Sequence, residues 1–114
     1  MEWLPVGSDF DQLKRLIIDL DEFLTEKPRS FIEGQFRHGS LDAGNYIEEL
    51  MGSFCYYMSD GGYSRLYIRI FPNPNVWLDM SLSSEKSKAK WDLPESQRIR
   101  SEIVDLLNKI MEEN

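Results

Sequence analysis

Residues 53–82, SFCYYMSDGGYSRLYIRIFPNPNVWLDMSL, contain three runs in which apolar and polar residues alternate. Two turn signals separate the runs, DGG at 60–62 and PNPN at 72–75. A period of two residues, interrupted by Gly, Asn and Pro, is typical of β-strands joined by turns. The Asp-Gly pair also supplies the positive φ angles that a tight hairpin needs. The stretch therefore predicts an antiparallel meander of three strands.

The alternation gives the predicted sheet two chemically different faces. The aliphatic face takes Leu66, Ile68 and Ile70 from the middle run, and Val76, Leu78, Met80 and Leu82 from the third. The opposite face takes Arg65, Tyr67, Arg69, Phe71, Trp77, Asp79 and Ser81. In the first run, Phe54, Tyr56 and Met58 share one side, and Cys55 and Tyr57 share the other. We expect helices to cover the aliphatic face and the aromatic face to stay partly open.

Residues 8–27 have the clearest helical pattern, with Ser8 as the expected N-cap and Pro28 as the stop. Apolar residues at helical spacing define its buried arc: Phe10, Leu13, Leu16, Ile17, Leu20, Phe23 and Leu24. Acidic residues occupy the other side. Ile18 projects among them, so we expect it to be an exposed contact residue.

A second clear helix is predicted from about Pro94 to Glu112, with Asp92 as its N-cap and a wide apolar stripe for the core. Residues 83–92 before it are interpreted as a polar, Lys-rich loop. Residues 29–40 are compatible with a short helix, an edge strand or a loop. Ser40 is a possible N-cap for a helix ending near Met51, although Gly44 weakens that prediction.

This order, α-(α)-β-β-β-α, predicts a single α+β domain over residues 1–114. Its antiparallel sheet has three strands, or four if residues 29–40 add an edge strand, and its helices pack mainly on one face.

Composition narrows the functional classes. The chain has 20 acidic and 13 basic residues, a net charge of −7, which makes nucleic acid or an anionic membrane a poor partner. A single cysteine, Cys55, and no visible signal peptide favour a cytoplasmic protein. No apolar run is long enough for a membrane span.

The sequence contains no recognisable metal-binding, cofactor-binding or catalytic motif. His38 and Cys55 are the only residues of their kinds, so we expect no Cys/His metal site within one chain. No phosphate-binding, dinucleotide-binding or nucleophile-elbow pattern occurs, so we expect no cofactor and no catalytic residue. Carboxylates are abundant, but nothing selects two of them as an acid–base pair.

The distribution of charge is more informative. Residues 1–26 hold seven acidic and two basic residues, and residues 41–62 hold four acidic residues and no basic one. Such stretches are ordinary for solvated helix faces, but beside a Tyr-rich strand they also suit an interface that steers a cationic partner. The predicted partner-binding residues are Asp19, Glu22, Glu26, Asp42, Glu48, Glu49, Tyr57 and Asp60, with Tyr67 and Trp77 as aromatic anchors.

In size, acidity, lone Cys55 and α+β build, the chain resembles the immunity proteins of bacterial toxin–immunity systems, including those of contact-dependent growth inhibition. The resemblance implies a non-enzymatic inhibitor, a monomer or weak homodimer, that occludes the active site of a basic, nuclease-type toxin domain. The alternative is a small acidic secretion-type chaperone, which dimerises and binds an effector client through apolar grooves or an open strand edge. An enzyme that uses a carboxylate pair is the third hypothesis.

Overall fold

The three predicted strands form one sheet backed by helices. The computed structural model describes residues 7–37, 53–58, 64–70 and 76–112. In chain order the elements are α1 (Gly7–Thr25), α2 (Arg29–Arg37), β1 (Ser53–Tyr57), β2 (Arg65–Ile70), β3 (Val76–Ser81), α3 (Glu85–Trp91) and α4 (Pro94–Glu112). The sheet is antiparallel throughout, with the order β1-β2-β3. The α+β class and the meander are therefore confirmed.

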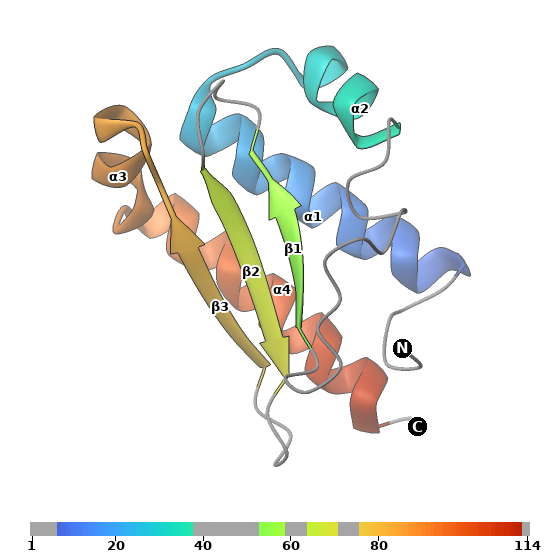
Figure 1. Ribbon diagram of the computed structural model, residues 1–114. Helices are drawn as coiled ribbons and strands as arrows, with labels where there is room; N and C mark the ends of the chain where they lie inside the picture. Colours follow the sequence, from blue (N-terminus) through green and yellow to red (C-terminus); the bar gives the residue numbers. More distant parts are fainter. Residues whose placement is uncertain (1–6, 38–52, 59–63, 71–75, 113–114) are drawn as a thin grey trace.

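Helices α1 and α4 lie along the same face of the sheet and pack against each other (Figure 1). Leu66 and Ile68 of β2 are fully buried on this face, as the alternation predicts. The helices contribute the apolar arcs expected from their sequences, namely Leu13, Ile17, Leu20 and Leu24 from α1 and Ile99, Ile103, Leu106, Leu107 and Ile110 from α4. This core determines which of the described strand side chains face the helices.

Residues 29–37 form a helix, which decides most of the ambiguous segment 29–40. Ile32 and Phe36 of α2 are fully buried, and α2 packs against α1. The expectation that Ile18 is an exposed contact residue is therefore wrong, because this side chain is only 2% exposed. The sequence pattern assigned α1 a single buried arc, whereas α2 covers a second side of it.

The Lys-rich segment is also a helix and not the predicted loop. Ser84 caps α3 by accepting a hydrogen bond from the backbone amide of Ser87. Asp92, expected to cap α4, is instead the C-cap of α3, and its carbonyl accepts a hydrogen bond from Gln97 at 2.9 Å. Helix α4 itself spans the predicted residues.

Helix α3 supports the end of α1 (Figure 1). The hydroxyl of Ser87 donates to the carbonyl of Leu24 at 3.0 Å, and Nζ of Lys90 donates to the carbonyl of Phe23 at 3.0 Å. These carbonyls belong to the last turn of α1, where a helix leaves its acceptors unpaired. Glu26 follows in the left-handed region, with φ 58°, so the helix ends at Thr25 and not at the predicted residue 27.

At the other end α1 begins at Gly7, so Ser8 lies inside the helix instead of capping it. The predicted helix from Ser40 to Met51 lies outside the described residues. Within the described part of the chain, no helix is both long and apolar enough to cross a membrane.

Candidate functional site

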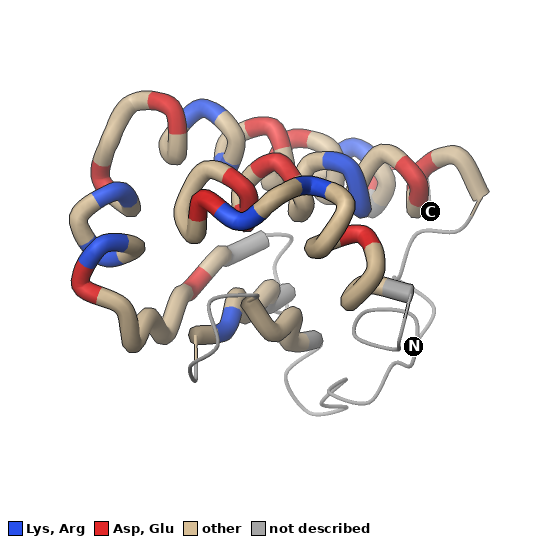
Figure 2. Tube along the Cα trace, turned by 90° about the horizontal axis from the view of Figure 1, so that it is seen from above, with Lys and Arg blue, Asp and Glu red and all other residues tan. Residues whose placement is uncertain are grey.

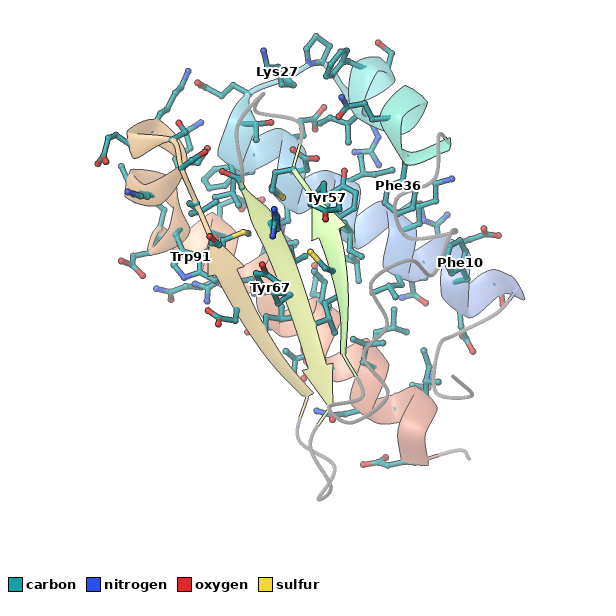
Figure 3. All side chains as sticks on the ribbon, viewed as in Figure 1. Phe10, Lys27, Phe36, Tyr57, Tyr67 and Trp91 are labelled. Carbon is teal, nitrogen blue, oxygen red and sulfur yellow. The ribbon has the colours of Figure 1, made fainter. Side chains whose placement is uncertain are left out.

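The side of the sheet that faces away from α1 and α4 carries the most distinctive group of side chains. We call it the open face and define it by Cys55, Tyr57, Arg65, Tyr67 and Asp79. The strand register places Tyr57 beside Arg65, and it places Tyr67 between Cys55 and Asp79. Figure 3 shows Tyr57 and Tyr67 on this side, and no described helix covers it.

Arg65 is the centre of the open face. Its guanidinium carbon lies 5.0 Å from the ring centroid of Tyr57, which is a cation–π geometry. Its Nη1 donates to the hydroxyl of Tyr67 at 3.4 Å. The two tyrosines therefore hold one cation from two sides, and all three side chains are half-buried. The hydrogen bond to Tyr67 raises the pKa of Arg65, and an arginine side chain stays charged in a protein in any case.

The predicted α1 carboxylates are engaged within the chain. Nη1 of Arg29 in α2 lies 2.6 Å from Asp19 and 3.8 Å from Glu22, and its Nε lies 3.3 Å from Glu33. The hydrogen bond to Asp19 is the largest of the effects that raise the pKa of Arg29. Glu26 pairs with Lys86 and Lys90 of α3. The structure thus brings Asp19 and Glu22 together around one arginine, and places Glu26 at the α1–α3 junction.

These carboxylates do not form one patch with the aromatic anchors. They belong to α1, in the helical layer, whereas Tyr57 and Tyr67 lie on the other side of the sheet (Figures 1 and 3). Of the other predicted residues, Asp42, Glu48, Glu49 and Asp60 lie outside the described residues, as does the side chain of Trp77 in β3. The described site consequently reduces to the open face.

The charge excess is also unevenly divided. The described ranges hold 14 acidic and 13 basic residues, a net charge of −1, so six of the seven excess negative charges belong to the remaining residues. Figure 2 shows acidic and basic residues interleaved along the helices. The helical layer therefore presents a mixed surface and not a uniformly acidic one.

The sequence did not lead us to predict a buried polar pair, Tyr56 and Asp21. Asp21 of α1 has no exposed surface, and the hydroxyl of Tyr56 donates to its Oδ2 at 2.6 Å. Thr25 donates to its Oδ1 at 3.0 Å. Burial, reinforced by the negative charge of Asp21, raises the pKa of Tyr56 far above its ordinary value. The signal was present, because Asp21 lies four residues after Ile17 and three before Leu24, inside the buried arc.

Surface pockets lined by described residues border the helices. One, of about 400 Å³, lies between β3 and α4 and is lined by Leu78, Gln97, Arg100, Ser101, Val104 and Asp105. Smaller ones, of about 290 and 300 Å³, lie between α1 and α4 and between α1 and α2. Each mixes acidic and basic side chains with one or two apolar ones. No group of His, Cys, Asp and Glu among the described residues is suited to hold a metal ion.

Comparison of the chain with models of known protein families, with curated proteins and with solved structures gives no match.

Proposed function

We propose that this chain is a protein-binding inhibitor of the immunity type, which binds a basic, nuclease-type toxin domain in the cytoplasm and occludes its active site. The open face is the observation that carries the proposal. Tyr and Arg are enriched at the energetic centres of protein interfaces, where a rigid ring or a planar guanidinium adds contact area at low entropic cost. Here two tyrosines and an arginine are already held against one another.

Net charge supplies the second part of the proposal. A chain with a net charge of −7 attracts a basic partner at long range, which raises the association rate and makes that rate sensitive to salt. The carboxylates of α1 contribute to this field but are not the anchors, because Asp19, Glu22 and Glu26 are held by Arg29, Lys86 and Lys90. The anchors are the tyrosines of the open face.

The test uses the product of the neighbouring upstream gene, expressed as an inactive variant, and measures its affinity for this chain by calorimetry. We expect Tyr57→Ala and Tyr67→Ala each to weaken binding about 30-fold, as hot-spot tyrosines do. Phe31→Ala is the matched control, since Phe31 is an aromatic side chain, 48% exposed, on α2, which packs against α1. Its expected effect is less than about threefold.

Co-expression provides the functional readout. The wild-type chain should restore growth to cells that produce the active neighbouring protein, and the Tyr67→Ala variant should restore it less well. No binding and no protection by the wild-type chain would refute the proposal. Equal losses in Tyr67→Ala and Phe31→Ala would refute the assignment of the open face.

A secretion-type chaperone is the second proposal, and the sheet edge favours it. No described strand pairs with the outer edge of β3, and an extended client could add a strand there. Such a chaperone is expected to dimerise, so sedimentation at high protein concentration distinguishes the two functions. A strictly monomeric protein would exclude the chaperone and leave the inhibitor.

A further inference from the structure

Arg65 has more hydrogen-bond donors than the described residues satisfy. A guanidinium carries five N–H groups. The described contacts are one long hydrogen bond to Tyr67, at 3.4 Å, and the ring of Tyr57. Nε of Arg65 is shielded from solvent and has no hydrogen-bond partner. A buried donor without a partner is costly, so in a native protein it calls for an explanation, and an acceptor supplied by a bound partner is one such explanation.

No carboxylate of the described residues pairs with Arg65, although Asp79 lies on the same face. The register sets Asp79 opposite Tyr67 and sets Arg65 opposite Ser81, one row further along the sheet. Oδ1 of Asp79 already accepts a hydrogen bond from the backbone amide of Met80 at 2.8 Å. Arg29 differs in this respect, because it has three carboxylates within 4 Å.

From this geometry we infer that Arg65 is a carboxylate anchor: it pairs with an Asp or Glu side chain of the protein partner, between the Tyr57 ring and the Tyr67 hydroxyl. The inference rests on the proposed function and names the chemistry recognised at its site. Charge complementarity selects the occupant, because an arginine fork presents parallel N–H groups to the two oxygens of a carboxylate.

A carboxylate at this point is compatible with a basic partner. A nuclease-type domain can be basic overall and still hold Asp or Glu side chains where it binds metal ions. An arginine that pairs with such a group would block the active site directly. The surrounding tyrosines would exclude water from the pair, which strengthens it relative to an exposed ion pair.

The first experiment needs no identified partner. The 15N-labelled protein is titrated with the peptide acetyl-Gly-Glu-Glu-Gly-amide, and the Arg65 Nε–Hε and Tyr67 amide signals are followed by NMR. The peptide should move both signals saturably, whereas acetyl-Gly-Gln-Gln-Gly-amide should not. Arg65→Gln should abolish the response at Tyr67. Arg98→Gln, an exposed arginine of α4 already bonded to Glu95 and Glu102, should leave it intact.

Three results would overturn the inference. Equal responses to the Glu and Gln peptides would show that the carboxylate is not recognised. Binding of inorganic phosphate as tightly as the Glu peptide would make the site a general anion site. Shifts of Arg65 with protein concentration alone would identify a second copy of this chain as the occupant.

The second experiment separates this inference from the proposed function. In the complex with the neighbouring gene product, Arg65→Gln should raise Kd about 30-fold, mainly through faster dissociation, and Arg98→Gln should raise it less than threefold. Arg65→Lys, which keeps the charge but loses the fork, should fall between them. Equal effects of Arg65→Gln and Arg98→Gln overturn the anchor and leave the inhibitor standing. If no complex forms, the inhibitor is refuted while the peptide titration still decides the anchor.

Discussion

Tyr56 and Tyr57 are neighbours in β1 that point to opposite faces of the sheet, and each contacts one charged side chain. Tyr56 is 1% exposed and donates to Asp21, which has no exposed surface. Tyr57 is half-buried and lies against Arg65. A carboxylate in the core must have its hydrogen bonds supplied within the chain, because no solvent reaches it. A half-buried guanidinium, in contrast, can leave N–H groups unbonded within the chain, so that they can donate to another molecule.

The pair in the core contributes mainly to stability, whereas the pair on the open face is available for recognition. The Tyr56–Asp21 pair joins β1 to α1 and so links the sheet to the helical layer. The Tyr57–Arg65 pair joins two adjacent strands that are already hydrogen-bonded to each other, so the fold depends on it far less. Substitutions on the two faces should therefore have different consequences.

The largest effect is expected for Tyr56→Phe. This change removes the hydroxyl that donates to Asp21 at 2.6 Å and leaves a buried carboxylate short of a donor. We expect a loss of about 2–3 kcal/mol in the free energy of unfolding, measured by urea denaturation. Arg65→Gln is the matched change on the open face and should cost less than about 1 kcal/mol. Equal losses would contradict the assignment of the two faces.

Alkaline pH should weaken the same pair. The pKa of Tyr56 is raised in the folded protein, whereas in the unfolded chain it is about 10. Stability is therefore fully present below about pH 10 and falls above it, by up to about 1.4 kcal/mol per pH unit, as the unfolded tyrosine ionises. Tyr56→Phe lacks this group, so the stability gap between wild type and variant should narrow from pH 9 to pH 11. A constant gap would argue against the buried, protonated tyrosine.

Ser87→Ala tests the support of the helical layer from α3. The hydroxyl of Ser87 is buried and donates to the carbonyl of Leu24, near Asp21 and Thr25 at the end of α1. Its loss should reduce the free energy of unfolding by about 1 kcal/mol. Hydrogen exchange should then show faster opening of the last turn of α1 than of the sheet. Uniform acceleration throughout the protein would mean that Ser87 has no local role.

Asp19→Asn should have the smallest effect. Its pair with Arg29 is short, at 2.6 Å, but the two side chains are 44% and 36% exposed, and solvent screens the interaction. We expect a change of about 0.5 kcal/mol or less in stability, which added salt should reduce further. Binding of the partner should change less than threefold. A large loss of affinity would show that α1 belongs to the partner-binding surface and would contradict the assignment of binding to the open face.

The meander, the aliphatic face and the buried arcs of α1 and α4 were all predictable, because each depends on local periodicity. Helix α3 was not, since EKSKAKW carries little apolar signal and forms a helix through the Ser84 cap and its contacts with α1. The burial of Ile18 was missed for a related reason. It depends on α2, a helix whose own sequence was ambiguous.

The candidate site was predictable only in part. Alternation placed Tyr57, Tyr67 and Arg65 on one face, but it could not show that the Tyr57 ring and the Tyr67 hydroxyl would both contact the guanidinium. A count of charged residues selected Asp19, Glu22 and Glu26, because such a count shows the sign of each side chain but not whether it forms an ion pair within the chain. Their partners, Arg29, Lys86 and Lys90, come from other helices, and such contacts are decided by tertiary packing.

The packing of α1 against α4 has a consequence for biosynthesis. These helices cover the same face of the sheet, yet all three strands lie between them in the chain. A growing polypeptide therefore leaves its ribosome with the aliphatic side of the meander uncovered until α4 has also emerged. Products that stop before Pro94 should remain unfolded and bind chaperones or be degraded.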